Sequence, residues 1–288
     1  MSSVHRVALR TGIEIEYEDH GVGERPFVLV HGFTGSRDDW RERLPELARL
    51  GRTIALDQRG HGGSTKTGDA ASYTFERLVD DLAALHDALG LGPWDLLGHS
   101  LGGMVVLRLA LAHPRCVRSL ILMNTAPHGV PLATRPLLEA GAQLGRAQGM
   151  AALAAVMRAG QSRAGPPAPA RARVVAEMGE DAFWARAARK IAQMEPESFL
   201  ALGTALHEQE AVTGRLGELG VPTTLLVGDQ DAPFLEATET MRTGITDATS
   251  VILKDAAHSP QLETPGPWLD AVRAHLDRVR ALRSSTSG

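Results

Sequence analysis

The sequence predicts an α/β fold, with a mostly parallel sheet, an N-terminal antiparallel hairpin and a helical insertion. Short apolar runs alternate with amphipathic segments along most of the chain, which is the pattern of parallel strands covered by helices on both faces. The interval 127–218 breaks this rhythm, because it contains only helix-like segments rich in Ala, Arg, Met and Leu. With 288 residues, 43% of them hydrophobic, the chain is large enough for one core domain with such an insertion.

The strands and helices follow from periodicity. Residues 4–20 alternate apolar and polar positions around Thr11-Gly12, which predicts the antiparallel hairpin. After Pro26, continuous apolar runs replace this alternation, as expected for strands buried on both faces. The predicted strands are 27–30, 53–56, 94–97, 120–123, 224–227 and 251–253. The predicted helices between and after them are 38–50, 75–89, 101–113, 234–243 and 265–282.

The same pattern predicts the domain organisation. We expect residues 1–126 and 219–282 to form the core and residues 127–218 to form a helical cap over the carboxyl edge of the sheet. Pockets in open α/β sheets lie at that edge, so the cap would roof a site. A proline-rich break at 164–169 divides the insertion, and the serine-rich tail, 283–288, is predicted to be disordered.

Composition narrows the classes of partner and compartment. A formal charge of −4 with no basic run argues against nucleic acid, and the lack of 18 consecutive apolar residues argues against a membrane span. The single cysteine, Cys116, cannot form an internal disulfide and is expected to be a small buried residue. Because the first residues also lack the pattern of a secretory signal, we expect a cytoplasmic protein. Monomer and homodimer are both compatible with the sequence.

Ser100 is the strongest functional candidate. It lies in Gly98-His99-Ser100-Leu101-Gly102, where a predicted strand turns directly into a predicted helix. Glycines two residues before and after a serine allow a strained turn in which a larger side chain would meet backbone, and the hydroxyl then projects above the sheet. The pattern therefore favours a nucleophile over an ordinary glycine-rich turn.

A nucleophilic serine needs a histidine as base and a third group to orient that histidine. His258 follows the last predicted strand, at the carboxyl edge where Ser100 also lies. Asp229 and Asp231 both follow the preceding strand. Asp231 has more freedom to reach the histidine, whereas Asp229 is expected to bond loop backbone. The backbone N–H groups of Leu101 and Phe33 are the predicted donors to the oxyanion.

Several segments together resemble the sequence motifs of the α/β-hydrolase superfamily, in the family's order and across about residues 4–282. They are His31-Gly32-Phe33, 57–64, 98–103, 228–231 and 258–263. The chain is most similar to the serine-nucleophile branch of esterases and lactonases with a helical cap. This resemblance implies Ser100 as nucleophile, Asp231 as acid, His258 as base, and Phe33 and Leu101 as oxyanion donors.

The other polar candidates are expected to be structural. The resemblance implies that Asp57 and Arg59 brace neighbouring loops. His31 and His61 lie in glycine-rich turns and are expected to be hydrogen-bonded scaffold, and His99 should point away from the nucleophile because successive strand residues face opposite sides. No histidine pair has the spacing of a metal site, and no glycine loop ends in the Lys-Ser/Thr of a nucleotide site. The predicted chemistry requires no cofactor and no metal.

The predicted reaction is acyl transfer to water from a small or medium apolar carboxylic ester or lactone. One alternative is a carbon–carbon bond hydrolase or a cofactor-free lyase with the same triad; Ser259 weakens it, since such hydrolases usually carry tryptophan after the catalytic histidine. Another alternative is a non-catalytic ligand receptor. Serine at the turn between the predicted strand and helix disfavours epoxide hydrolysis and dehalogenation, because related enzymes for those reactions use a carboxylate nucleophile. Apolar residues of the insertion are predicted either to line the pocket or simply to pack: Met150, Leu153, Met157, Met178, Phe183, Trp184 and Met194.

Overall fold

The computed structural model describes residues 3–131, 133–161 and 167–284. They form an eight-stranded sheet in the order β1-β2-β4-β3-β5-β6-β7-β8. Strand β2 is antiparallel to both β1 and β4, and all the other neighbouring strands are parallel. The strands are β1 (Ser3–Ala8), β2 (Glu14–His20), β3 (Phe27–Val30), β4 (Thr53–Leu56), β5 (Trp94–His99), β6 (Val117–Met123), β7 (Thr223–Gly228) and β8 (Ala248–Leu253). The predicted fold class, including the N-terminal hairpin, is confirmed.

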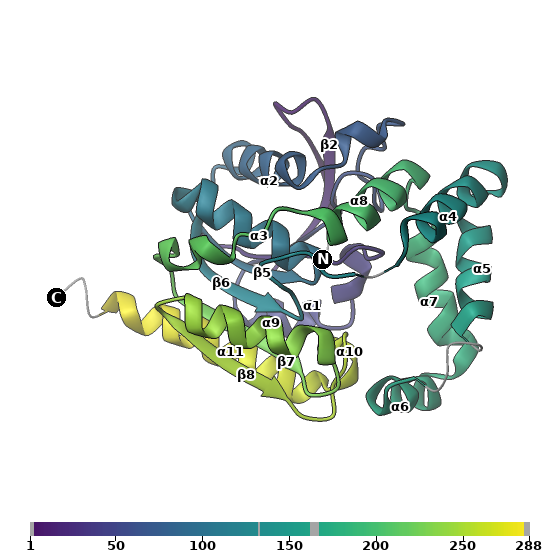
Figure 1. Ribbon diagram of the computed structural model, residues 1–288. Coiled ribbons are helices and arrows are strands. Elements are labelled where there is room, and N and C mark those ends of the chain that lie inside the picture. The colour runs from purple at the N-terminus through teal and green to yellow at the C-terminus, as the bar shows by residue number, and fades with distance from the viewer. Residues whose placement is uncertain (1–2, 132, 162–166, 285–288) are drawn as a thin grey trace.

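Helices cover both faces of the sheet, as alternating residues of each strand require (Figure 1). In β3, Val28 and Val30 pack into one core with α2, α3 and α9, whereas Phe27 and Leu29 pack into a second core with α1 and α11. Strands buried on both faces explain the continuous apolar runs in the sequence. The α-helices outside the insertion are α1 (Leu44–Leu50), α2 (Phe75–Leu89), α3 (Leu101–Ala112), α9 (Ala232–Gly244), α10 (Pro260–Glu263) and α11 (Pro265–Ser284).

One predicted helix is wrong in part. The segment 38–50 is divided into the 3₁₀ helix η1 (Arg37–Trp40) and helix α1. Pro45 lies in the first turn of α1, where its missing N–H removes no helical hydrogen bond. In a single continuous helix the same proline would lie in the interior and break it. The other 3₁₀ helices are η2 (Ala70–Ser72), η3 (Pro114–Cys116) and η4 (Thr213–Glu218).

The interval between β6 and β7 holds helices that lie beside the carboxyl edge of the sheet (Figure 1). They are α4 (Arg135–Gln148), α5 (Met150–Gln161), α6 (Pro169–Met178), α7 (Glu180–Ala192) and α8 (Pro196–Glu208). We call this group the insertion helices; their independence as a domain with the bounds 127–218 stays a prediction. Residues 164–166 of the proline-rich break and residues 285–288 of the tail lie outside the described residues. The predicted tail begins too early, at residue 283, because α11 continues to Ser284.

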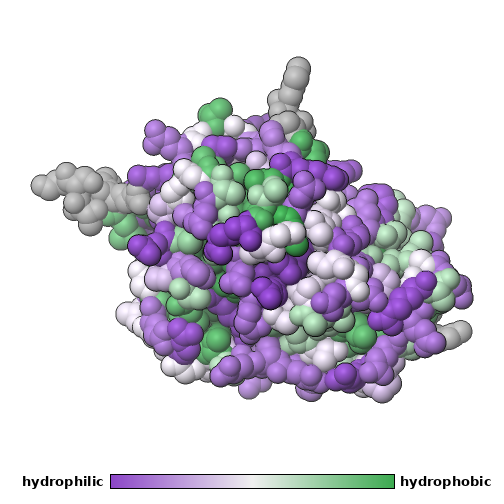
Figure 2. All heavy atoms as spheres, turned by 90° about the horizontal axis from the view of Figure 1, so that it is seen from above, coloured by the Kyte–Doolittle hydropathy of each residue, from purple (hydrophilic) through white to green (hydrophobic). Residues whose placement is uncertain are grey.

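Charged and polar side chains cover most of the face shown in Figure 2, with small apolar patches between them. Large exposed apolar side chains are scattered over the chain, at Val4, Val22, Leu137, Val156, Ile252 and Leu282. Within the described ranges, no helix combines the length and hydropathy needed to cross a bilayer.

Candidate active site

Ser100 occupies the sharp turn between β5 and α3. Its backbone has φ 53° and ψ −118°, a conformation that residues other than glycine rarely adopt. A Cβ at Gly98 would lie 2.5 Å from the Gly102 carbonyl oxygen, and one at Gly102 would meet the Val30 and His31 carbonyls. The turn therefore requires glycine at both positions, as the sequence predicted. The structure maintains a strained backbone at a serine that is itself 8% exposed.

The predicted base and acid are in contact. His258 Nδ1 lies 2.7 Å from Asp231 Oδ2, and the histidine side chain is 43% exposed, whereas that of the aspartate is 9% exposed. A carboxylate in this position selects the tautomer that protonates Nδ1 and leaves Nε2 as an acceptor. Asp229 instead accepts a hydrogen bond of 3.2 Å from the Ala256 N–H, so it bonds backbone of the neighbouring loop.

His99, the residue before Ser100, links the turn that carries the serine to the loop that carries His258. Its Nε2 donates to the carbonyl oxygen of His258 at 2.7 Å, and the two imidazole rings lie 4.9 Å apart. The sequence predicted only that His99 points away from Ser100; its contact with His258 comes from the structure. Burial lowers the pKa of His99 to about 3, so the ring is neutral. Ser100 Oγ makes no hydrogen bond within the described part of the chain, and its bond to His258 would have to form with substrate present, as is common for catalytic groups.

The predicted oxyanion donors flank Ser100. A Cβ built on Gly32 would lie 3.3 Å from Ser100 Cβ, so the loop that carries Phe33 touches the serine. Among the residues that the structure describes, neither the Phe33 N–H nor the Leu101 N–H donates to a protein acceptor. Leu101 is also the first residue of α3, where the helix dipole favours negative charge. Two backbone N–H groups that could bind an oxyanion thus lie in the segments that adjoin Ser100.

Two polar side chains form hydrogen bonds that support the site, and the sequence did not predict this role for either of them. Asn124 is fully buried, and its amide donates to Asp231 Oδ2 at 2.5 Å and to the Ala257 carbonyl at 3.0 Å. Glu263 Oε2 accepts hydrogen bonds from the N–H groups of Ala257 at 2.7 Å and Ser259 at 3.1 Å. These N–H groups lie on either side of His258. A polar residue directly after strand β6 was the available signal for Asn124.

The residues predicted as scaffold are hydrogen-bonded. Asp57 accepts from the N–H groups of Arg37 and Gly63, and Arg59 forms a buried ion pair with Asp81. The remaining scaffold candidates, His31 and His61, are both buried and contact backbone carbonyls of the loop that carries Phe33.

Aromatic side chains contact two of the predicted site residues, His258 and Phe33. The Phe234 ring stacks on His258 at 5.0 Å, and the Phe33 ring stacks at 5.4 Å on Phe199 of α8. Of the apolar insertion residues, Met150, Leu153 and Met194 are buried in the core. Phe183 and Trp184 are half-buried and pack edge to face.

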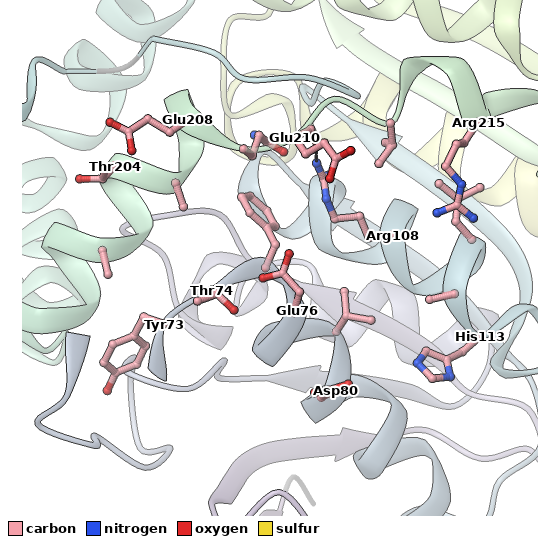
Figure 3. A pocket seen from close by; sticks show the side chains of 18 of the residues that line it. Tyr73, Thr74, Glu76, Asp80, Arg108, His113, Thr204, Glu208, Glu210 and Arg215 are labelled. Atoms are coloured by element: carbon pink, nitrogen blue, oxygen red, sulfur yellow. Dashed lines mark hydrogen bonds between the residues drawn. The ribbon is translucent and has the colours of Figure 1, made fainter. Parts of the chain in front are cut away.

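A cavity of about 700 Å³ lies elsewhere, between α2, α3, α8 and η4 (Figure 3). Ser100, Asp231 and His258 do not line it. Arg108 reaches along its wall and donates to the carbonyls of Met104 and Glu210.

No three His, Cys, Asp or Glu side chains within the described ranges are grouped to hold a metal ion. Cys116 is buried, and this burial raises the pKa of its thiol, as expected for a structural residue.

Comparison with known proteins identifies the fold family of the chain. The sequence pattern of the alpha/beta hydrolase fold matches residues 25–265, so the chain belongs to this family. It is 36% identical, over 132 residues, to a 2-hydroxymuconate semialdehyde hydrolase from Pseudomonas sp. (strain CF600), a match that covers 45% of this chain and 46% of that protein. The chain spans less than half the length of the curated relatives that it matches first.

Solved structures match over nearly the whole chain. A thermophilic esterase from Thermogutta terrifontis with malate bound has a TM-score of 0.77 at 30% identity, covering 96% of this chain and 99% of that one. A structure from a study of carboxylesterases of Nitrososphaera gargenis has a TM-score of 0.79 at 25% identity, covering 96% and 99%. The fold of these solved structures therefore extends over nearly the whole chain.

Proposed function

We propose that this protein is a serine hydrolase that cleaves a small or medium apolar carboxylic ester or lactone through an acyl-enzyme. The observation that carries this proposal is the hydrogen bond of 2.7 Å between His258 and Asp231, at the same sheet edge as the strained Ser100. The likeness to a solved esterase at 30% identity supports the ester as substrate.

The proposed mechanism assigns one step to each group. Ser100 Oγ attacks the substrate carbonyl while His258 Nε2 takes its proton, and Asp231 stabilises the imidazolium that results. The N–H groups of Phe33 and Leu101 bind the negative oxygen of the tetrahedral intermediate. His258 returns the proton to the leaving alcohol oxygen. Water, activated by the same histidine, then releases the acid and restores the serine.

The aromatic surroundings support an apolar substrate. The Phe234 ring stacks on His258, and the Phe199 ring stacks on that of Phe33, whose N–H is a proposed oxyanion donor. The insertion helices would cover the substrate as a cap. We propose such a cap for residues 127–218. A covered apolar site favours small acyl and alcohol groups over polymers.

The test is hydrolysis of p-nitrophenyl acetate and butyrate by the wild type and by Ser100→Ala. We expect Ser100→Ala to lose at least about 10³-fold in kcat/KM, because no other group can form the acyl-enzyme. Ser250→Ala, on edge strand β8, serves as the control and should hydrolyse at the wild-type rate. Equal rates for wild type and Ser100→Ala would overturn the proposal.

A fluorophosphonate probe separates the hydrolase from a non-catalytic receptor. It should label the wild type at Ser100 and leave Ser100→Ala unlabelled. A wild-type protein that binds ligand but neither reacts with the probe nor turns over esters would favour the receptor.

The second candidate is carbon–carbon bond hydrolysis by the same residues. It is favoured by the 36% identity with a 2-hydroxymuconate semialdehyde hydrolase over 132 residues. A panel of vinylogous diketones discriminates between the two reactions. Turnover of these compounds without ester turnover would make the second candidate the function.

A further inference from the structure

The peptide group that joins Gly32 and Phe33 is held from its carbonyl side. The Gly32 oxygen accepts hydrogen bonds from His31 Nδ1 at 2.8 Å and from the Gly35 N–H at 3.1 Å. Because a trans peptide is planar, its C=O and N–H groups point in opposite directions. Holding the Gly32 oxygen therefore sets the direction of the Phe33 N–H, one of the two proposed oxyanion donors.

The surroundings of His31 determine which ring nitrogen carries the proton. The Gln58 N–H, which can only donate, approaches His31 Nε2 at 3.0 Å. Nε2 must accept that bond, so the proton is on Nδ1 and points to the Gly32 oxygen. Burial lowers the pKa of His31 to about 3, which keeps the ring neutral and the arrangement unchanged around neutral pH.

A second imidazole holds the next peptide group. His61 Nε2 lies 2.6 Å from the Phe33 carbonyl oxygen, and its Nδ1 lies 2.9 Å from the Arg59 oxygen. Burial lowers the pKa of His61. The hydrogen bonds with these two carbonyls would raise the pKa, but their effect is smaller than that of burial. The neutral ring carries one proton, and the shorter contact assigns it to Nε2. The rings of His31 and His61 pack edge to face at 4.9 Å.

We propose that His31 and His61 are positioning residues of the oxyanion hole, which orient the Phe33 N–H by holding the peptide groups on either side of Phe33. This inference rests on the proposed function. Neither ring touches the substrate; each acts through backbone. Preorganised donors stabilise a transition state without reorganising during the reaction, so a misdirected N–H should slow catalysis more than it weakens substrate binding.

The two histidines use different nitrogens, and this difference supplies the experiment. The amide nitrogen of asparagine lies near the position of Nδ1 and that of glutamine near Nε2. At residue 31 we therefore expect His31→Asn to retain more activity than His31→Gln, and at residue 61 we expect His61→Gln to retain more than His61→Asn. Since losing one oxyanion donor costs about 10²–10³-fold, a donor that is only misdirected should cost roughly 10–100-fold in kcat, with KM changed less than about threefold.

Binding of inhibitors gives a second readout. A trifluoromethyl ketone adds to the serine and places its oxyanion in the hole, whereas the uncharged butyl 4-nitrophenyl ether has no carbonyl group and cannot form an oxyanion. At each position, the affinity of the less active variant for the ketone should fall by about the same factor as its kcat/KM. Its affinity for the ether should equal that of the wild type. Fluorophosphonate titration counts the folded, reactive protein in each sample.

His275→Gln is the matched control. His275 is also buried and neutral, and contacts Thr224 and Ser119 through its two ring nitrogens, far from the serine. It should lose stability without loss of kcat per titrated site. Equal losses for the asparagine and glutamine variants at both positions would overturn the positioning roles while leaving the hydrolase intact. A wild type that neither reacts with the probe nor turns over ester would overturn the proposed function and the inference together.

Discussion

Asn124 shows how a single residue can support the geometry of this site. Its amide nitrogen bonds both Asp231 and the backbone of the loop that carries His258, and its own backbone has a positive φ of 46°. Asparagine tolerates this conformation better than most residues. The side chain therefore combines a special backbone position with a hydrogen bond that orients the proposed acid.

Replacing Asn124 by glycine separates these two contributions. Glycine accepts the positive φ, so Asn124→Gly removes the amide without adding backbone strain. We expect kcat for p-nitrophenyl butyrate to fall about tenfold, since losing a hydrogen bond to a charged group corresponds to roughly 1.5–3 kcal/mol. Steady-state kinetics with fluorophosphonate titration measures this. A variant as active as the wild type would show that Asp231 needs no support from the Asn124 amide.

At the scale of elements, the insertion helices are joined to the core on both sides of the site. Helix α7 reaches η1 through the ion pair of Lys190 with Asp39, and it reaches the segment between η1 and α1 through the ion pair of Arg186 with Glu42. Helix α6 reaches the loop of His258 through Arg173, which donates to the carbonyls of Asp255 at 2.9 Å and Glu263 at 2.8 Å. Polar contacts thus set the position of α6 and α7 over the sheet edge.

The pair of Lys190 and Asp39 makes this attachment testable. Burial would raise the pKa of the Asp39 carboxyl, but the charge of Lys190 outweighs it and holds the pKa below its usual value. Lys190→Met leaves a buried carboxylate unpaired and should lower the free energy of unfolding by about 3–5 kcal/mol. The double variant Lys190→Met with Asp39→Asn should be more stable than Lys190→Met alone. Urea unfolding measures both, and purely additive effects would contradict the coupling.

At the scale of the whole molecule, buried neutral histidines link stability to pH. Burial lowers the pKa of His31 and His99 to about 3 and that of His275 to about 4. In the unfolded chain a histidine takes up a proton below about pH 6.5, whereas these folded histidines do so only near their lowered pKa values. The unfolded state therefore binds more protons, and stability falls as the pH drops from 6.5 towards 4.

We expect each of these histidines to reduce the free energy of unfolding by about 2 kcal/mol between pH 7 and pH 5. Replacing His275 by glutamine should remove about one proton from the pH dependence in this interval, whatever it does to stability at pH 7. Urea unfolding at a series of pH values measures the slope. An unchanged slope would mean that His275 is not neutral in the folded protein.

Local patterns were sufficient to predict most of the fold. The predicted strand over residues 27–30 and the predicted helix over residues 75–89 agree with β3 and α2 to the residue. A strand buried on both faces gives a continuous apolar run, and a helix buried on one face gives an amphipathic periodicity, so both can be recognised in the sequence. Ser100 could be predicted as well, since its glycines are needed by a local turn. The prediction of one helix over 38–50 is wrong because Pro45 lies in the first turn of a separate helix, α1.

The sequence by itself determined the architecture, the strained serine and the group of residues from which a base and an acid could come. Only the tertiary structure decided that Asp231 rather than Asp229 contacts His258. It also decided that Asn124 and Glu263 form hydrogen bonds with this acid and with the loop of the histidine. The contacts of His31 and His61 with the peptide groups on either side of Phe33 likewise come from the tertiary structure. Periodicity records which face of a strand or helix is buried. Contacts between side chains and loop backbone depend on distances across the fold, and no local pattern records these.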